Sequence, residues 1–501
     1  MVLLTYIFFI LLFTYCKGYH ECNQKKTDYG YVCVCDSSKC DTVPEIDVST
    51  GKFQMFSTSS NKMGFTASSG TLKPSSNTNF GYKIDLQNSS VKQKVIGFGG
   101  AFTDSSGINI KSLPEGAQKN LLNSYFGSSG VQYSLGRVPM GGTDFSIRQY
   151  TYDDHDGDLE LKYFSLQNED HVYKIPLIKK AYKLSNNSLN LFASSWTAPP
   201  WMKNTDMYAS GILKDEYYQT WADYYIKFFQ EYKKSGVNFW GLTTQNEPVD
   251  GFVPSLVFPL NSLGFTTAQM KKWVSENLGP TIRKSEFKDL KIIAHDDQRT
   301  FLQIFSSVWE DDDSGKYIDG VGVHWYWDAF APNSVLELAK SSKKDLFLLG
   351  TEACNGAPVK LGSWERGQSY IKSIISDFEY GAGGWMDFNL VLNQEGGPHV
   401  ILNPLDSPII VNNSTGEFYK QPMYYAMGHF SKFLRPDSVV LEVQNNLTAN
   451  LKSVAALRPD GLTAVIVYNE GSESAKVEVI SKGGSVLQTS VPAKSINTIL
   501  F

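Results

Sequence analysis

Short apolar segments alternate with amphipathic segments of helical period through the middle of the chain, from about residue 92 to residue 392. Eight of the apolar segments have the length and character of buried strands. These segments are 93–101, 134–140, 189–196, 237–244, 291–297, 319–327, 346–353 and 383–390. Eight strand–helix units favour a (β/α)8 barrel of the α/β class, and an open doubly wound sheet is the alternative.

Two of the helices between these strands have clear sequence signals. One is an apolar stripe at helical spacing, formed by Trp221, Tyr224, Tyr225, Phe228, Phe229 and Tyr232. Gly236 is expected to end that helix, because glycine tolerates the left-handed conformation found just past many helix ends. A second helix is expected to begin after Thr266 or Thr267 and to run through Trp273 to Gly279.

The two flanks of this region have a different pattern. Residues 46–91 and 435–501 alternate between apolar and polar positions with period two, and short turn sequences separate the segments. This alternation is typical of antiparallel strands with one buried face. We expect a β-sandwich assembled from both flanks, because chain termini often lie close together in a fold.

The first 15 residues contain an apolar run of the length found in secretory signals, which is short for a membrane span. We predict cleavage near Gly18, with an uncleaved anchor as the alternative, because no Lys or Arg precedes the run. No later apolar stretch in the sequence is long enough to span a membrane. Export would make glycosylation candidates of the Asn-x-Ser/Thr sequences, which begin at Asn88, Asn186, Asn412, Asn413 and Asn446.

Cysteine spacing adds a constraint near the N-terminus. The cysteines that cluster there are Cys22, Cys33, Cys35 and Cys40. In an exported chain they predict two disulfides, with three possible connectivities. A zinc site is disfavoured, because Cys-x-Cys followed by a lone cysteine lacks paired Cys-x-x-Cys spacing. Cys354 stands alone and is interpreted as a buried thiol, since no histidine lies beside it in the sequence.

Composition and motifs exclude several classes of function. Hydrophobic residues make up 42% of the chain, which is typical of a globular protein. The net charge of −5, from 46 Lys and Arg against 51 Asp and Glu, argues against a nucleic-acid partner. The sequence GFGGAF at 97–102 has Phe102 in place of the third glycine of a dinucleotide-binding fingerprint. Without a P-loop or a His-x-x-x-His pair in the sequence, we expect no cofactor and no metal.

The chemistry is predicted from two glutamates, each at the end of a predicted strand. Glu247 follows the fourth strand in LTTQNEPVDG, and Glu352 ends the seventh strand in LFLLGTEACNG. The carboxyl ends of barrel strands meet at one face, so these side chains are expected to face each other. Two carboxyl groups that flank one bond are the requirement for glycoside hydrolysis. A strand-end salt bridge is the alternative for either glutamate taken alone.

Their surroundings predict different roles. Desolvation would raise the pKa of Glu247 and suit it to be the general acid. Arg137, in the second strand, is the candidate cation that keeps Glu352 ionised, and Asn246 can donate a hydrogen bond to a sugar hydroxyl. A carboxyl separation of about 5 Å means retention, and about 6.5–9.5 Å means inversion. Other polar and aromatic residues at strand ends are Asp144, Trp196, His324, Tyr326, Trp385 and Asp387.

Several motifs resemble the lysosomal acid β-glucosidases that hydrolyse glucosylceramide, the glucocerebrosidase family. The matching sequences are TTQNEP, GTEACNG, RVPM, SSWTAPPWMK, HWYWDAFAP and LNQEGGP. The resemblance covers nearly the whole mature chain. It implies a (β/α)8 TIM barrel, a discontinuous β-sandwich and a small disulfide-bonded N-terminal β-sheet. The implied ranges are a signal peptide at 1–18, a small domain at 19–45 and 390–422, a sandwich at 46–91 and 435–501, and a barrel at 92–389 and 423–434.

The resemblance also implies functional residues. It implies retention, with Glu247 as acid/base and Glu352 as nucleophile. The implied substrate-binding residues are Asp144, Trp196, Asn246, Asn403 and, near the nucleophile, Tyr326. It pairs Cys22 with Cys33 and Cys35 with Cys40. Phe388, in WMDFN, stands where the family usually has a tryptophan, so stacking on the sugar could remain but an indole hydrogen bond could not.

The resemblance implies a substrate and a setting as well. The substrate is glucosylceramide or a related β-glucosyl lipid, and a saposin-type activator and an anionic membrane surface are the expected partners. The expected location is the lysosome, or secretion through the signal peptide. A barrel hydrolase of β-linked polysaccharide and a non-catalytic carbohydrate-binding barrel are the alternatives.

Overall fold

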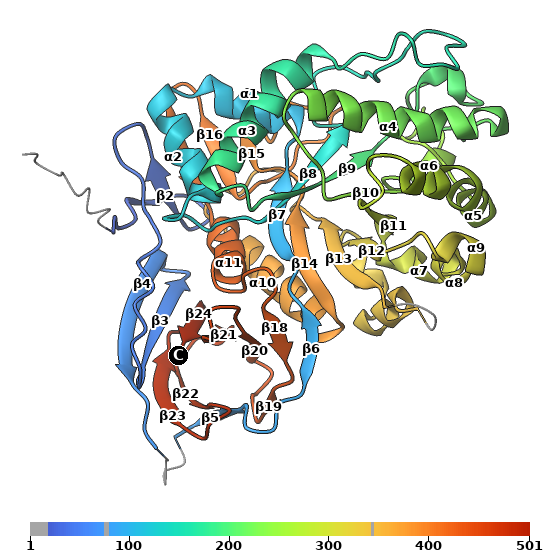
Figure 1. Cartoon of the computed structure of the whole chain (residues 1–501). Coiled ribbons are helices and arrows are strands. Elements are labelled where there is room, and N and C mark those ends of the chain that lie inside the picture. Colours follow the sequence, from blue (N-terminus) through green and yellow to red (C-terminus); the bar gives the residue numbers. More distant parts are fainter. Residues whose placement is uncertain (1–18, 75–79, 342–344) are drawn as a thin grey trace, which may run out of the picture.

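The computed structural model describes residues 19–501 except 75–79 and 342–344, so the predicted signal peptide lies outside the described residues. Within this part of the chain, the eight predicted strands form a closed barrel of parallel neighbours, and the open-sheet alternative is wrong (Figure 1). The barrel strands are β7 (Gly97–Ala101), β8 (Leu135–Met140), β9 (Asn190–Ser195), β10 (Gly241–Thr243), β11 (Lys291–Gln298), β12 (Gly320–His324), β13 (Phe347–Glu352) and β14 (Ala382–Asp387).

Helices in the connections surround this barrel (Figure 1). The helices are α1 (Asp104–Ser112), α2 (Glu115–Phe126), α3 (Ile175–Leu184), α4 (Tyr218–Lys234), α5 (Thr267–Trp273), α6 (Gly279–Lys284), α7 (Leu302–Phe305), α8 (Ser307–Glu310), α9 (Asp312–Gly315), α10 (Trp364–Glu379) and α11 (Pro422–Ser431). All six residues of the predicted aromatic stripe on α4 are buried. Within the described residues, no helix has the length and apolarity needed to cross a membrane.

The predicted end of α4 is confirmed in detail. Gly236 has φ +81°, its N–H donates to the Lys233 carbonyl at 2.9 Å, and the Val237 N–H donates to the Tyr232 carbonyl at 2.9 Å. This pair of bonds satisfies carbonyls that the helix end leaves unpaired. Glycine therefore terminates α4 because of its left-handed backbone.

The predicted end of the second helix is wrong. Thr266 caps α5, as expected, through a reciprocal capping box with Gln269. The helical path then continues through a π-helical turn, Val274–Leu278, into α6. Gly279 has an ordinary helical φ of −57°, and a Cβ there would lie 2.3 Å from the Tyr317 ring. Glycine is needed at this position for close packing and not for termination.

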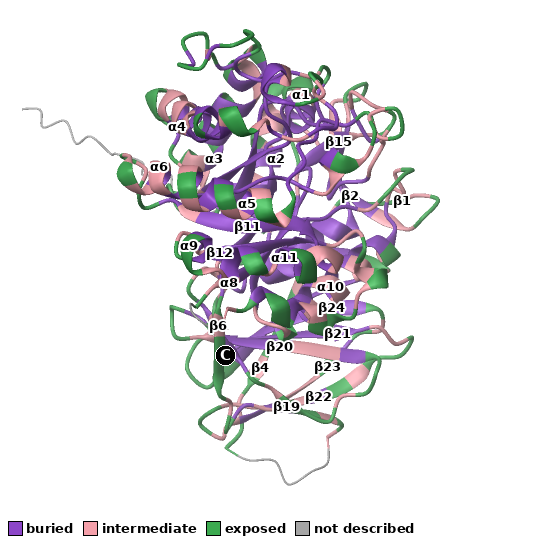
Figure 2. Ribbon diagram, turned by 90° about the vertical axis from the view of Figure 1, so that its right-hand side faces the viewer, coloured by how far each residue is buried: buried purple, intermediate pink, exposed green. Residues whose placement is uncertain are grey.

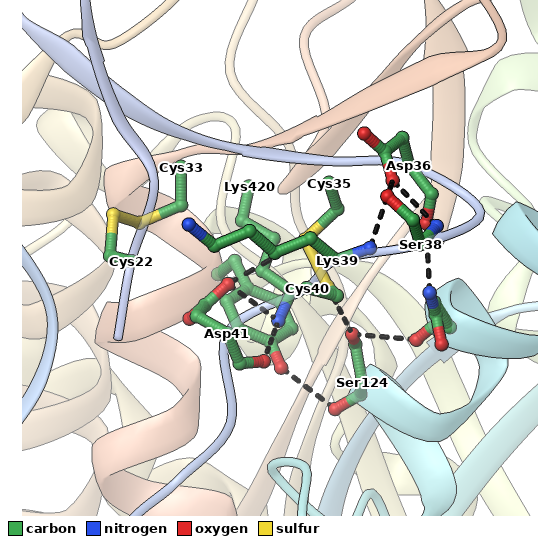
Figure 3. Close-up of a disulfide and its surroundings, with 12 residues drawn as sticks. Cys22, Cys33, Cys35, Asp36, Ser38, Lys39, Cys40, Asp41, Ser124 and Lys420 are labelled. Atoms are coloured by element: carbon green, nitrogen blue, oxygen red, sulfur yellow. Dashed lines mark hydrogen bonds and ion pairs between the residues drawn. A yellow bond between two sulfur atoms is a disulfide. The ribbon is translucent and has the colours of Figure 1, made fainter. Parts of the chain in front are cut away.

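A small sheet joins the N-terminal segment to the region after the last barrel strand. Its strand order is β1 (Gln24–Lys26), β2 (Tyr31–Cys35), β17 (Glu417–Lys420), β16 (Ile409–Asn412) and β15 (Val391–Asn393). Disulfides join Cys22 to Cys33 and Cys35 to Cys40, which is the connectivity that the resemblance implies (Figure 3). Lys420 forms a buried ion pair with Asp41 at 3.0 Å and holds the cysteine segment against this sheet.

The β-sandwich contains strands from both flanks and lies below the barrel in Figure 1. One described sheet has the order β4 (Lys62–Thr71), β3 (Lys52–Ser59), β24 (Ser495–Leu500), β21 (Thr463–Asn469), β20 (Leu451–Leu457), β18 (Val439–Leu441) and β6 (Val91–Lys94). The other has the order β19 (Gln444–Asn445), β5 (Tyr82–Asp85), β22 (Ala475–Ile480) and β23 (Val486–Val491). Alternate side chains such as Ile84, Val465 and Val477 are fully buried in a core of their own.

Burial separates the layers of the molecule. Figure 2 shows the barrel strands almost entirely in the buried colour, with the exposed colour on the outer faces of the helices and on the loops. Helices α10 and α11 contact both the barrel and the sandwich. The residue limits assigned to the domains stay a prediction, while the barrel, sandwich and N-terminal sheet are all present.

Candidate active site

Glu247 and Glu352 meet at the C-terminal end of the barrel strands. Glu352 is the last residue of β13, and Glu247 lies in the loop that follows β10. Three atoms, one carboxylate oxygen of each glutamate and one ring nitrogen of His324, all lie within 4.8 Å of one another. The separation between the two carboxyl groups is close to the roughly 5 Å found in retaining glycosidases. It is too short to admit the attacking water of an inverting site.

The surroundings of Glu247 favour its protonated form. Its φ is +41°, an uncommon conformation for a residue with a side chain, and its N–H donates to the Asp296 carbonyl at 3.0 Å. Burial raises the pKa of Glu247, and the negative charge of Glu352 adds to the rise, while the hydrogen bond with His324 opposes it. A raised pKa keeps the proton that a general acid must donate.

Glu352 is held from two sides. Arg137 forms an ion pair with Oε2 of Glu352 through Nη1, and the Tyr326 hydroxyl donates to Oε1 at 2.9 Å. Arg137 is fully buried, and its pKa is raised because Asp296 and Glu352 outweigh the effect of burial. Arg137 is therefore the cation beside Glu352, as the sequence predicted, and both groups of this ion pair are buried.

Arg137 also orients Asn246. Nη2 of Arg137 donates to Oδ1 of Asn246 at 2.8 Å, and the guanidinium lies over the Trp196 ring at 4.7 Å from its centroid. Because the carbonyl oxygen of Asn246 is occupied, its amide N–H groups are the ones left to reach a ligand. This orientation suits donation to a sugar hydroxyl.

Asp144 carries a buried acceptor without a protein partner. Its Oδ2 accepts a hydrogen bond from Nδ2 of Asn403 at 2.8 Å, but its buried Oδ1 has no hydrogen-bond partner in the described part of the chain. Burial, and then the charge of Glu352, raise the pKa of Asp144 to about 7. An unpaired buried acceptor costs free energy, so Asp144 is suited to a ligand that supplies a hydroxyl donor.

Phe388 supports the aromatic part of the site. It stacks on Trp196 with ring centroids 5.8 Å apart and an angle of 10°, and it meets Phe145 edge-on at 5.1 Å. Only 3% of Phe388 is exposed. Its ring therefore packs face to face against Trp196, and the guanidinium of Arg137 also lies against that indole.

Two of the strand-end residues noted in the sequence, Trp385 and Asp387, contact neighbours other than the two glutamates. Trp385 packs edge-on against Trp325 at 5.7 Å and at a tilted angle against Tyr370 at 4.7 Å. Asp387 accepts a hydrogen bond from the Tyr370 hydroxyl and another from the Asn389 N–H. These contacts give Trp385 and Asp387 a packing role inside the barrel.

The chain matches the glycosyl hydrolase family 30 TIM-barrel domain over residues 95–434 and the beta sandwich domain of that family over residues 437–499. The chain belongs to glycosyl hydrolase family 30. It is 40% identical to the lysosomal acid glucosylceramidase of Mus musculus, over 97% of this chain and 96% of the mouse protein. It is 37% identical to the putative glucosylceramidase 4 of Caenorhabditis elegans, over 96% of this chain and 95% of that protein.

A solved structure agrees with this assignment. SrfJ from Salmonella typhimurium is similar with a TM-score of 0.82 and 26% identity, over 90% of this chain and 99% of SrfJ. Family 30 membership confirms the expectation of a glycoside hydrolase with a TIM barrel and a β-sandwich. The roles assigned to single residues stay predictions.

His324 has a central place in this family 30 site that its position at a strand end did not predict. Its Nδ1 lies 2.8 Å from Oε1 of Glu247, and its Nε2 lies 3.0 Å from Oδ1 of Asp296. Burial opposes the charged ring, but the carboxylates of Glu352, Asp296 and Glu247 outweigh it and raise the pKa of His324 well above its ordinary value. The polar run HDDQ, which ends the otherwise apolar β11, is the sequence signal that could have located Asp296.

The same cluster has the residue types of a metal site, but its chemistry does not fit one. A histidine ligand must be neutral and offer a lone pair to the metal. The raised pKa of His324 keeps its ring protonated, and both ring nitrogens already face carboxylates. The cluster is therefore better suited to hold protons than a cation.

Proposed function

We propose that this protein is a retaining β-glucosidase that hydrolyses glucosylceramide, or a related β-glucosyl lipid, to glucose and the free lipid alcohol. The approach of the Glu247 and Glu352 oxygens to within 4.8 Å is the observation that carries the reaction type. The name of the mouse relative, 40% identical over nearly the full length of both chains, supports the lipid substrate.

In the first step, an oxygen of Glu352 attacks the anomeric carbon while Glu247 donates its proton to the glycosidic oxygen. The carbon–oxygen bond to the lipid breaks, and a covalent glucosyl–Glu352 ester forms. In the second step, Glu247 removes a proton from a water that attacks the same carbon, and Glu352 leaves as a carboxylate. The anomeric configuration is inverted twice and therefore retained.

The contacts around the cluster suit a single glucose ring. Asp144 offers its unpaired Oδ1 as an acceptor, and Asn246 offers amide N–H groups as donors. Trp196 offers an aromatic wall, and Phe388 stacks on it. Phe388 stands where the family usually has a tryptophan that faces the sugar, and its ring acts on the sugar through Trp196. Asn403, through its bond to Asp144, positions the acceptor.

Exposed apolar side chains at the same end of the barrel suit the lipid part of the substrate. The loop after β10 exposes Leu256 at 96%, Val257 at 75% and Phe252 at 50%, and the loop after β12 exposes Phe330 at 81%. Exposed apolar clusters mark interaction surfaces. We propose that these loops contact a membrane surface that holds the lipid, with a saposin-type activator as a second partner and the lysosome as the location.

The proposal is tested with purified protein on three substrates: an aryl β-glucoside, glucosylceramide in vesicles with and without anionic lipid, and a β-linked glucan. We expect hydrolysis of the first two, stimulation by anionic lipid, and β-glucose as the first product seen by NMR. Preference for the glucan would favour the polysaccharide-hydrolase alternative. Sugar binding without turnover of any substrate would favour the carbohydrate-binding alternative.

A further inference from the structure

Gln298, the last residue of β11, contacts the proposed acid/base from a neighbouring strand. Its side chain is buried, and Nε2 donates to Oε1 of Glu247 at 2.6 Å. The same oxygen faces Nδ1 of His324 at 2.8 Å. Gln298 and His324 are paired neighbours in the register of β11 and β12. Two donors from adjacent strands therefore meet on one carboxylate oxygen of Glu247.

An irregularity in β11 precedes Gln298 and directs it toward Glu247. His295 and Asp296 have φ +75° and +56°, and the register with β12 shifts between His295 and Asp297. The N–H of Gln298 then donates to Oδ1 of Asp297 at 2.7 Å, and the Gln298 carbonyl lies 3.1 Å from Nε2 of His295. Irregularities of this kind re-aim the side chains beside them. The backbone of Gln298 is therefore held in place by local contacts.

The amide of Gln298 is only partly satisfied by the protein. Its Oε1 is buried and has no hydrogen-bond partner in the part of the chain that the structure describes. An unpaired buried acceptor costs free energy, so the amide at this position is not explained by stability. The contact that it does make is with the acid/base.

The contact bears on which oxygen of Glu247 holds the proton. An oxygen that already accepts two N–H hydrogen bonds is the poorer place for the proton of a carboxylic acid, so the proton belongs on Oε2. A general acid must bring its proton within hydrogen-bond reach of the leaving oxygen. The orientation of the carboxyl plane, which its Oε1 contacts fix, decides whether Oε2 can do so.

We propose that Gln298 is a positioning residue of the acid/base, which together with His324 fixes Oε1 of Glu247 so that Oε2 presents the proton to the glycosidic oxygen. The inference rests on the proposed function and deepens it. In the second step, Oε2 accepts the proton of the attacking water, and the same two donors stabilise the Glu247 carboxylate that acts as base.

The titratable and charged groups around Glu247 come from its own loop and from four barrel strands. They are Asp250 in the loop, Arg137 in β8, Asp296 and Asp297 in β11, His324 in β12 and Glu352 in β13. A neutral substitution at Gln298 leaves all of these groups in the chain. A change in the pH at which Glu247 loses its proton then reports the lost hydrogen bond, which favours the charged form.

The test compares wild type with Gln298→Met, which keeps a long side chain but has no N–H to donate, on a β-glucoside with a poor leaving group. We expect kcat/KM at the optimum to fall by about 10–100-fold, because the acid is no longer held in place. The basic limb of the pH profile should move to higher pH by about one unit, because the Glu247 carboxylate has lost a donor. On a dinitrophenyl glucoside kcat/KM should change little, since that leaving group needs no acid.

Gln298→Glu is a second variant of nearly the same shape, in which an acceptor replaces the amide donor. Its basic limb should also lie at higher pH, because a second carboxyl group beside Glu247 disfavours the charged form. Gln303→Met is the matched control, because Gln303 is an exposed residue of α7. The pH profile of this control should coincide with that of wild type.

The pH profile and the leaving-group dependence decide between positioning and a structural role. A basic limb of Gln298→Met that stays in place or moves to lower pH, or equal losses on both substrates, would overturn the inference. If Gln298→Met does not fold, the profile of Gln298→Glu decides, and failure of both variants to fold would assign Gln298 a structural role instead. These outcomes leave the proposed function intact, whereas a wild type inactive on every β-glucoside would overturn that function itself.

Discussion

Arg137 and Asp296 form a fully buried ion pair, with 2.7 Å between Nη2 and Oδ2, beneath the two glutamates. The pair is the centre of a continuous chain of contacts. Arg137 reaches Glu352 on one side, and Asp296 faces His324, which in turn faces Glu247, on the other. Charges of opposite sign alternate along this chain, so the proposed nucleophile and the proposed acid are electrostatically connected.

Breaking this ion pair should damage both stability and activity. In Asp296→Asn, Arg137 and His324 lose a buried counter-charge, and removal of one partner from a buried pair costs about 3–5 kcal/mol. We expect kcat/KM on an aryl β-glucoside to fall by about 100-fold or more, since both glutamates lose their orientation. Chemical denaturation and steady-state kinetics measure the two effects.

Asp289→Asn is the control for that substitution, because Asp289 is an exposed residue of the same chemical type just before β11. Its stability should stay within about 0.5 kcal/mol of wild type. Similar behaviour of the two variants would contradict a central role for the Arg137–Asp296 pair.

Removal of the proposed nucleophile should be reversible by an external one. Glu352→Gly should lose at least about 10⁴-fold in kcat. Azide should restore turnover of an activated β-glucoside and yield α-glucosyl azide, because the small anion occupies the space of the missing carboxylate and a single displacement inverts the anomeric carbon. NMR of the product decides the outcome. Formation of β-glucosyl azide would contradict the nucleophile role of Glu352, because that product arises when azide attacks a glucosyl-enzyme ester in a variant of the acid/base.

Removal of the proposed acid should depend on the leaving group. Glu247→Gln keeps the shape of the side chain but has no proton to donate. We expect a loss of about 10²–10⁴-fold on glucosylceramide and a much smaller loss of glycosylation rate on a dinitrophenyl glucoside. Equal losses on both substrates, measured by pre-steady-state kinetics, would remove the acid assignment from Glu247.

The buried acids predict that the protein is more stable at pH 5 than at pH 7.5. The pKa is raised to about 7 for Asp144 and Asp297 and to about 9 for Asp250, in each case mainly by burial. The folded state then holds protons that the unfolded chain releases above pH 4, so stability falls as pH rises from 4 toward 7.

Two buried histidines act in the opposite sense over part of the same range. Burial lowers the pKa of His295 and His429 to about 3, so their contribution to stability is lost as pH falls below 6.5. The acids with raised pKa values outnumber these two histidines. The raised pKa of His324 also makes the folded state more stable at low pH than at high pH. We expect a thermal midpoint higher by roughly a few °C at pH 5. An equal or higher midpoint at pH 7.5 would contradict the burial of these acids.

Much of the fold could be predicted from local patterns. The eight barrel strands, the stripe on α4 and the period-two flanks each depend on the spacing of apolar side chains within one segment. Gly279 shows the limit of such patterns. The residue type alone suggested a helix end, but the ring of Tyr317, distant in the sequence, requires glycine inside a continuing helix.

The sequence by itself determined that Glu247 and Glu352 would lie at one end of the barrel, because parallel strands place their carboxyl ends at the same face. Only the tertiary structure decided how far apart they lie, and that His324 and Asp296 complete the network between them. Asp296 has φ +56°, and the strand register shifts beside it and beside His324. These irregularities turn side chains from separate strands toward each other, and no periodicity within a single strand encodes them.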